Sequence, residues 1–311
     1  MDAGKFMKWR VGDVSITRVA ELGGQPFPGT FMFPACTPEL VKRHNWLQPH
    51  FAHEDGRLFG SIHSFVIESG KRRIIVDTCV GNDKARSIQA WNRLQGPFLA
   101  DLAQAGFPAA SIDTVMCTHL HVDHVGWNTR LVEGKWVPTF AHARYLFGRR
   151  EWAHWSSEQA LHRDGDVMGD SVRPVFDAGL AELVDMDHQL TDEVRLEPTP
   201  GHTPGHVSVR IASRGEEAVI TGDLMHHPLQ CAEPDLANNF DVDAAAARRT
   251  RREFLARYSN TPVLVLGTHF APPTGGWVVE AKRAWRFDLT PPADAATPKA
   301  MTRAPGRARS R

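Results

Sequence analysis

The sequence predicts an α+β fold, and two observations carry that prediction. Short apolar or alternating runs such as residues 72–77 and 262–266 are typical of strands, whereas the alanine-rich run over residues 243–258 is typical of a helix. Strand-rich stretches punctuated by helices occupy both halves of the chain, on either side of about Glu158.

The strands are predicted from apolar patterns and from the turn residues between them. Residues 61–69 and 72–77 form a hairpin across Gly70 and Lys71. The other predicted strands are residues 8–20 with a turn at Gly12 and Asp13, 112–117, two strands within 131–147 around Gly134, 195–198, 207–212, 218–221, 262–266 and 276–287.

The helices are predicted from capping residues and composition. Thr37 is a good N-cap, and Pro38 and Glu39 suit the first turn of a short helix. Residues 243–258 become arginine-rich toward their end, and we expect those charges to face solvent. The other predicted helices are residues 97–105, 149–156 and 172–180.

Residues 22–60 are rich in proline and aromatic side chains and are too long for a simple connection. They form either a lid or docking surface at the rim of a site, or a packed surface loop. An exposed apolar lid usually meets a partner, and from this we predict a homodimer. Residues 291–311 are dominated by proline, alanine, threonine and arginine, and we expect a disordered basic tail.

The charge balance limits the classes of partner. Lysine plus arginine and aspartate plus glutamate number 36 each, so the formal net charge is zero. A neutral chain lacks the field expected of a nucleic-acid-binding protein, which counts against a nuclease. No run of 18 apolar residues exists, so we expect no membrane span.

The cysteines and the N-terminus indicate the compartment. Residues 1–10 lack the apolar stretch of a signal peptide. The four cysteines are scattered and show no C-x-x-C spacing, which is typical of free thiols in a reducing compartment. We therefore expect a cytoplasmic protein with free thiols at Cys36, Cys79, Cys117 and Cys231.

The segment at residues 118–124, Thr-His-Leu-His-Val-Asp-His, concentrates groups that bind metals. His119 and His121 alternate, so both imidazoles can point the same way from an extended segment. Asp123 and His124 follow at once, and the chain must bend to aim them at a second point. Imidazole and carboxylate suit zinc and related divalent metals. Four such groups in two pairs predict half of a site for two metals.

Three downstream residues are candidates for the other half. His202 lies in Gly-His-Thr-Pro-Gly-His at residues 201–206, Asp223 follows Thr-Gly, and His269 follows Gly-Thr. Each comes where a predicted strand ends, and such residues can converge on one edge of a sheet. Because the candidates run from His119 to His269, they favour a single domain, which we place at residues 1–290.

This ordered set resembles the metallo-β-lactamase-fold hydrolases. The resemblance rests on H-x-H-x-D-H, the histidine of G-H-T-P-G-H, G-D and a late histidine, in that order. It implies a four-layer αββα sandwich in which two sheets face each other, helices cover both outer faces, and the metals lie on one edge. It also implies that His119, His121 and His202 bind the first metal, that Asp123, His124 and His269 bind the second, and that Asp223 bridges both.

Neighbouring residues receive lesser roles. Asp77 and Thr78 resemble the family's D-T step before its first loop. We expect His206 to hold the loop of His202 rather than to bind a metal. We expect His227 to lie at the surface.

The implied cofactors are two divalent ions, with zinc expected first and manganese, cobalt or iron as alternatives. Two ions about 3.5–4 Å apart can share a water and lower its pKa from 15.7 toward about 7, which yields hydroxide at neutral pH. No nucleophilic serine or cysteine is then required. Asp123 can ligate and still relay a proton.

The fold hosts many reactions, so the site must choose between them. Flavin-linked diiron members of the family carry a carboxylate where His121 stands, and true β-lactamases lack the bridging Asp223. Glyoxalase-type thioesterases carry a C-terminal helical domain, for which too few residues follow His269. What remains is the group of acyl-homoserine lactonases, arylesterases and methyl parathion hydrolase.

Four residues are predicted to contact substrate, namely Phe31, Trp127, His226 and Phe270, and Asp123 and His226 are the predicted catalytic residues. Lactonases of this group carry a tyrosine three residues after the bridging aspartate, where this chain has His226. A histidine there resembles methyl parathion hydrolase more closely, although imidazole can also donate a hydrogen bond to a substrate carbonyl.

We therefore predict a binuclear metal-dependent hydrolase that cleaves a small uncharged ester-like substrate. A lactone of the acyl-homoserine type or an aryl ester is expected first. An organophosphate triester is the alternative substrate. A non-catalytic, metal-stabilised binding protein is the alternative of a different class.

Overall fold

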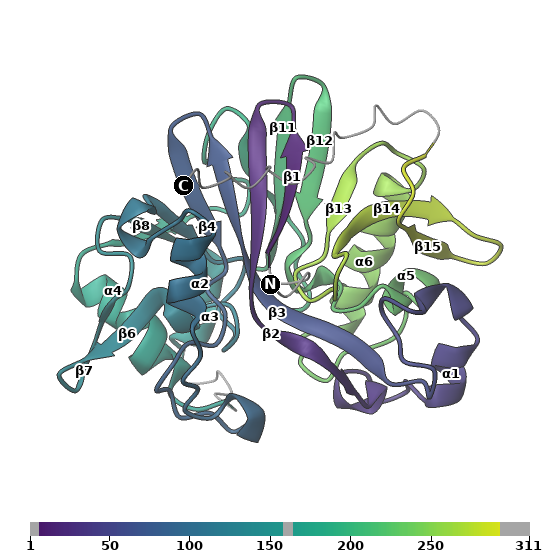
Figure 1. Ribbon diagram of the computed structural model, residues 1–311, viewed down its shortest axis with the longest axis horizontal. Coiled ribbons are helices and arrows are strands. Elements are labelled where there is room, and N and C mark those ends of the chain that lie inside the picture. The colour runs from purple at the N-terminus through teal and green to yellow at the C-terminus, as the bar shows by residue number, and fades with distance from the viewer. Residues whose placement is uncertain (1–5, 158–163, 293–311) are drawn as a thin grey trace, which may run out of the picture.

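The computed structural model describes residues 6–157 and 164–292, and most of their strands form two sheets that face each other (Figure 1). The first sheet has the order β1-β2-β3-β4-β5-β8-β9, and the second has the order β10-β11-β12-β13-β14-β15. The first contains β1 (Phe6–Val11), β2 (Val14–Phe27), β3 (Leu58–Ser69), β4 (Arg72–Val76), β5 (Thr114–Met116), β8 (Arg144–Gly148) and β9 (Ala181–Val184). The second contains β10 (Val194–Pro198), β11 (Val207–Ser213), β12 (Glu216–Ile220), β13 (Leu264–Leu266), β14 (Gly275–Glu280) and β15 (Trp285–Asp288).

Helices cover the outer face of each sheet. In Figure 1, α2 and α3 lie on the outer side of the first sheet, and α6 lies on the outer side of the second. A separate hairpin of β6 (Thr129–Val132) and β7 (Lys135–Pro138) projects beside the first sheet. The helices are α1 (Pro38–Lys42), α2 (Phe98–Gln104), α3 (Arg149–Trp155), α4 (Arg173–Asp177), α5 (Leu229–Ala232) and α6 (Ala244–Tyr258).

Alternating side chains on the central strands build three apolar layers. In β4, Ile74 and Val76 enter the core between the sheets, whereas Ile75 packs under the helices. In β13, Leu264 and Leu266 face the same central core, and Val265 faces α6. Strands that are buried on both faces require this continuously apolar sequence. The predicted four-layer αββα sandwich is confirmed.

The parallel strands decide where the site can form. The pairs β4–β5, β5–β8 and β8–β9 in the first sheet and β12–β13 in the second are parallel. The carboxyl ends of parallel neighbours meet at one edge of a sheet, so the loops after β4, β5, β12 and β13 can approach one another.

Several predicted elements differ in detail from the structure. Residues 8–20 hold two antiparallel strands rather than one, because the chain turns at Gly12 with φ +54°. Residues 276–287 likewise hold two strands, β14 and β15. Strand β9 was not predicted. The region of Glu158 and the tail from residue 293 onward lie outside the described residues.

Segment 22–60 combines the two structures expected for it. Residues 22–27 form the end of β2, where it still pairs with β3, and residues 28–32 follow in a turn; both stretches line a cavity, as a lid would. Beyond them, Phe33, Phe51 and Leu58 are buried in the apolar cluster under α6, as in a packed segment. The predicted helix at Thr37 is confirmed as α1, and the Thr37 hydroxyl accepts a hydrogen bond from Leu40 N.

Two predicted surface positions are buried, and both stabilise the segments around the site. The Arg251 side chain leaves the solvent face of α6 and donates to the carbonyl oxygens of Leu224 and Pro234 at 3.0 and 2.8 Å. The prediction that His227 lies at the surface is wrong, because the side chain is buried. Its Nε2 donates to Phe51 O at 2.8 Å, and its Nδ1 accepts from Leu229 N. The four cysteines are free, as predicted, and all are buried.

His227 makes the stability of the fold depend on pH. Burial, opposed only by the hydrogen bond to Phe51, lowers the pKa of His227 to about 4. The unfolded chain takes up this proton near pH 6.5 and the folded chain does not, so the stabilisation is present above pH 6.5 and is lost as the pH falls toward 4. The loss is on the order of 3 kcal/mol. We expect the difference in unfolding free energy between the wild type and His227→Gln to shrink by that amount between pH 7 and pH 4.5 in urea titrations.

The control for this measurement is His142→Gln, because His142 is exposed. Its difference from the wild type should not change with pH. A pH-independent difference for His227→Gln would contradict the assignment of a neutral, buried imidazole.

Candidate metal centre

The loop after β5 places four candidate ligands beside the end of β4. Asp77 fixes this loop, since its carboxylate accepts hydrogen bonds from Thr118 N and Thr118 Oγ1 at 2.7 and 2.9 Å and lies 3.0 Å from His124 Nδ1. Asp77 adopts φ +56°, a conformation that is rare outside glycine and that clusters at functional sites. Gly126 is required in the same loop, because a Cβ there would lie 1.9 Å from Val80 O.

The remaining candidates come from the second sheet. His202 lies in the connection between β10 and β11, Asp223 follows β12, and His269 follows β13. Gly222 turns the chain before Asp223 with φ +55°, and a Cβ there would lie 2.6 Å from His206 Nε2.

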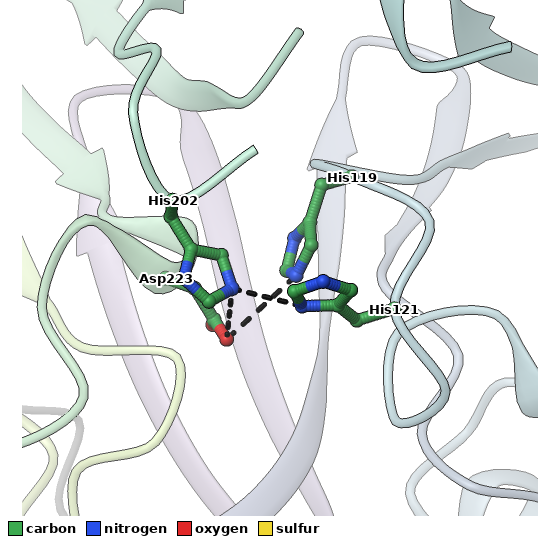
Figure 2. Close-up of side chains that lie close together, drawn as sticks. All are labelled: His119, His121, His202 and Asp223. Carbon is green, nitrogen blue, oxygen red and sulfur yellow. Dashed lines mark hydrogen bonds and ion pairs between the residues drawn. The ribbon is translucent and has the colours of Figure 1, made fainter. Parts of the chain in front are cut away.

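The structure brings all seven predicted ligands together in two groups. His119, His121, His202 and Asp223 form the first group (Figure 2), and Asp123, His124 and His269 form the second. Asp223 lies between them. Its Oδ2 is 3.4 Å from His202 Nε2 and 3.3 Å from His124 Nε2, and its Oδ1 is 3.1 Å from His269 Nε2.

The spacing of the ring nitrogens fits metal ions. Two nitrogens at about 2.0–2.1 Å from a tetrahedral zinc lie about 3.3 Å apart. His202 Nε2 and His121 Nδ1 are 2.9 Å apart, and His269 Nε2 and His124 Nε2 are 3.2 Å apart. Within the described chain, the buried atoms His119 Nε2 and Asp223 Oδ1 have no hydrogen-bond partner. Cations between these atoms would satisfy all of them.

The protonation states favoured in the first group agree with this interpretation, whereas Asp223, against the effect of burial, raises the pKa of His124 and His269 in the second group. Burial lowers the pKa of His119, His121 and His202 well below the usual range, so these imidazoles are neutral, as metal binding requires. Burial alone would raise the pKa of Asp223, but the surrounding imidazoles, His124 foremost, hold it well below its usual range. The first group therefore offers neutral imidazoles beside an ionised carboxylate.

Other buried groups orient the ligands from behind. The His119 Nδ1 lies 3.1 Å from Thr118 Oγ1, and His269 Nδ1 donates to Ser61 O at 3.0 Å. His202 Nδ1 donates to Asp241 Oδ1 at 2.9 Å. Such contacts fix which ring nitrogen faces the metal.

His206 is a positioning residue that contacts more than the loop predicted for it. Its Nδ1 lies 2.9 Å from Thr199 Oγ1 and its Nε2 accepts the backbone N–H of Asp223 at 2.7 Å. The side chain therefore holds Asp223 in place, in addition to the loop of His202.

The site opens into a cavity of about 980 Å³. Asp123, Asp223, His226 and His269 form part of its floor, and the described residues of its wall include no lysine or arginine. The apolar part of the wall includes Leu22, Phe27, Phe31, Met32, Ile62, Ile88, Trp91, Leu120, Val122, Trp155, Val167, Met168, Phe240 and Val242.

Of the four predicted substrate contacts, Phe31 and His226 line the cavity, whereas Trp127 and Phe270 do not. Trp127 is buried against Phe98, and its Nε1 donates to Glu21 at 2.6 Å. Phe270 is buried against Phe51 and Phe287. Their expected role is corrected: closeness to a ligand in sequence does not fix the direction of a side chain, and both of these turn into the core.

The family model described as the metallo-beta-lactamase superfamily matches residues 57–285. The chain belongs to the metallo-beta-lactamase superfamily.

Relatives within this superfamily are hydrolases. The chain is 24% identical over 187 residues to the probable metallo-hydrolase YybB of Bacillus subtilis (strain 168), an alignment that covers 58% of this chain and 72% of that protein. It is 27% identical over 168 residues to the N-acyl homoserine lactonase AiiA of Bacillus thuringiensis subsp. kurstaki, covering 50% of this chain and 60% of that one.

Solved structures extend the likeness over most of the chain. AidC, a dizinc quorum-quenching lactonase, superposes with a TM-score of 0.76 at 19% identity, over 93% of this chain and 99% of that chain. The hydrolase AbOPH superposes with a TM-score of 0.75 at 21% identity, over 92% and 98%. At these identities the likeness shows the fold. The predicted family, fold and hydrolase class are confirmed.

Glu151 and Asp241 are functional residues that the sequence analysis missed. The buried Glu151 carboxylate on α3 accepts from Gly205 N at 2.7 Å, Trp155 Nε1 at 2.8 Å and Leu120 N at 3.2 Å. It therefore ties the loop of His119 and His121 to the loop of His202. Within this superfamily member, two ligand loops from different sheets depend on one carboxylate.

Glu151→Gln tests this connection. The amide would turn an N–H toward a backbone or indole donor, and an unsatisfied buried donor costs about 1–3 kcal/mol. We expect the unfolding free energy to fall by that amount and zinc affinity to fall about tenfold, measured by urea unfolding and by competition with a chelating dye. The control is Glu182→Gln on β9, which is an edge strand of the first sheet. Unchanged zinc affinity in Glu151→Gln would refute the role.

Proposed function

We propose that this member of the superfamily is a binuclear metal-dependent hydrolase of uncharged ester-like substrates, with a lactone or an aryl ester as the first candidate. One observation carries the proposal: Asp223 lies between two groups of metal-binding side chains on the floor of an apolar cavity. Zinc suits the imidazole and carboxylate ligands best, and manganese, cobalt or iron are alternatives.

The ligands in this proposal are the predicted ones. His119, His121 and His202 would hold the first ion, Asp123, His124 and His269 would hold the second, and Asp223 would contribute to both sites. When bound, such a pair of ions supplies a Lewis acid for the substrate oxygen and an activated water. Asp123 lines the cavity and can accept a proton during attack.

The protein supplies binding and orientation around the ions. Since no lysine or arginine lies in the described wall, the cavity favours a neutral substrate over a carboxylate or a phosphate monoester. Its volume of about 980 Å³ exceeds the needs of a bare lactone ring, so we expect a substrate with a sizeable apolar group. The N-acyl homoserine lactonases among the relatives support this choice.

His226 is the proposed substrate-orienting group. It is buried in the cavity floor, and neither ring nitrogen has a hydrogen-bond partner within the described residues, although Nε2 lies 3.0 Å from Asp223 Oδ2. An imidazole N–H can therefore donate to a substrate oxygen as negative charge builds up on it.

Two alternatives remain candidates. A phosphotriester is also uncharged and fits the same wall. A metal-stabilised binding protein would use the same ligands without turnover. The homodimer also stays a prediction, for which the exposed Phe31 and Val242, 43% and 46% accessible at the cavity mouth, supply the apolar surface.

A turnover panel tests the proposal. Lactones of graded acyl length, aryl esters and phosphotriesters would be supplied to the zinc-loaded protein, with elemental analysis alongside. We expect about two ions per chain and hydrolysis of lactones or aryl esters, and Asp223→Ala should lose both properties. One tightly held ion that survives Asp223→Ala would refute the binuclear centre, and no turnover of any class would favour the binding protein.

His226→Ala separates orientation from metal binding. The variant should keep both ions and lose about tenfold in kcat on esters or lactones, with a smaller rise in KM, because the lost interaction belongs to the transition state. His226→Tyr should shift preference toward lactones by restoring a phenol donor. Full activity of His226→Ala on every substrate would show that His226 is a bystander.

A further inference from the structure

Residues 238–242 connect the lid to the first group of metal ligands. This short segment runs between α5 and α6 and contributes Phe240 and Val242 to the cavity wall. Its backbone contacts both sides: Asn239 N donates to Met32 O at 2.8 Å, and Val242 N donates to His202 O at 2.9 Å.

On the metal side, Asp241 orients His202. The carboxylate is fully buried, and its Oδ1 accepts from His202 Nδ1 at 2.9 Å. With the proton held on Nδ1, the His202 Nε2 stays free to face His121 Nδ1 and Asp223 Oδ2. A buried carboxylate behind a neutral imidazole also raises the basicity of the ligand.

On the lid side, Asn239 holds the 3-10 turn Gly29–Phe31 that follows β2. Its Nδ2 donates to Phe31 O at 2.9 Å and to Thr30 O at 3.2 Å. The Phe31 ring also packs edge-on against Phe240, with centroids 6.0 Å apart. The position of this exposed aromatic side chain therefore depends on residues 238–242.

The two sides are rigidly joined. Asp241 Oδ2 accepts from Asn238 N at 3.1 Å, and Asn238 Oδ1 accepts from Phe240 N at 2.7 Å. The carboxylate that orients His202 thus also closes the turn that presents Asn239 and Phe240. His202 and the lid contacts are therefore linked through the Asp241 side chain and this turn.

We propose that Asp241 is a positioning residue for the first metal and that residues 238–242 couple occupancy of that metal to the ordering of lid residues 27–33. This inference rests on the proposed function, since it assigns a metal to His202. Coupling of this kind is reciprocal. If the ion raises the affinity of the lid for a molecule that packs on Phe31, that molecule raises the affinity of the protein for the ion by the same factor.

Zinc binding without substrate tests the positioning role. Asp241→Asn removes the charge and turns an N–H toward Asn238 N. We expect one of two zinc ions to bind about 10–100-fold more weakly in dye competition, with an altered cobalt(II) visible spectrum. The buried donor left without an acceptor should also lower the melting temperature of the metal-free protein. Zinc affinity is therefore measured below that temperature and compared with the matched control, Asp243→Ser, which keeps the N-cap of α6 and does not touch the His202 side chain.

Equal affinity for both ions in Asp241→Asn and the wild type would overturn the positioning role and leave the proposed hydrolase intact. Conversely, a wild type that hydrolyses no ester while Asp241→Asn still weakens zinc would sink the proposed function and support this inference.

Hydrogen exchange tests the coupling. Zinc should slow exchange in peptides spanning residues 27–34 of the wild type by about fivefold or more, and Asn239→Ala should abolish that dependence while it changes zinc affinity less than Asp241→Asn does. Since Asn239 is exposed, this variant decides the coupling even where Asp241→Asn fails to fold. A rate of hydrogen exchange in the wild-type lid that does not change when zinc is added would overturn the proposed coupling.

Discussion

The arrangement of the candidate metal ligands depends on the buried carboxylate of Asp223. It is buried, ionised and surrounded by imidazole nitrogens of His124, His202, His226 and His269 at 3.0–3.4 Å. A buried carboxylate and a cluster of buried imidazoles are each costly away from water, and facing ring nitrogens cannot all donate to one another. Cations resolve both difficulties at once, so the stability of this edge and its proposed chemistry have the same origin.

Because several ligands must converge without moving, the surrounding structure holds each from behind. Asp77 follows β4 and Glu151 lies on α3, so both belong to the half of the sandwich built on the first sheet. His206 and Asp241 belong to the half built on the second sheet. Each of these contacts at least one ligand or ligand loop and lies outside the ligand set. Glu151 matters most for the architecture, since its three acceptor contacts join loops that belong to different sheets. The positions of the ligands therefore depend on how the two sheets pack together, because the loops of the first sheet present four of the seven ligands and those of the second present three.

The ligands were predictable from the sequence for a local reason. His119, His121, Asp123 and His124 form one dense cluster after a short apolar strand. His202, Asp223 and His269 each stand within two residues of a glycine near the end of a strand, so the sequence marks both the strand end and the turn. The alternating core strands were predictable on the same grounds, and His226 followed from its spacing to Asp223.

The supporting residues were not predictable, because their partners lie far along the chain. Glu151 reaches Leu120 and Gly205 across 31 and 54 residues, and Asp241 reaches His202 across 39. A lone acid on a helix or loop has the same sequence pattern whether it is solvated or buried. The prediction that Arg251 faces solvent failed for that reason. Its helix is rich in charged residues, yet this guanidinium is buried and donates to three backbone carbonyl oxygens.

Chemistry and substrate choice are carried by different parts of the chain. The ligands lie on strand ends whose positions the three apolar layers fix, and any substitution there disturbs a core. The cavity wall is contributed instead by residues 22–32, 88–91, 167–168 and 239–242, which lie mostly outside the central strands. Changes in these segments can alter the wall without moving the ligands. The exception is residues 238–242, where the wall and the support of His202 share one turn. At Asp241, a change in the turn that carries the wall also changes the support of His202.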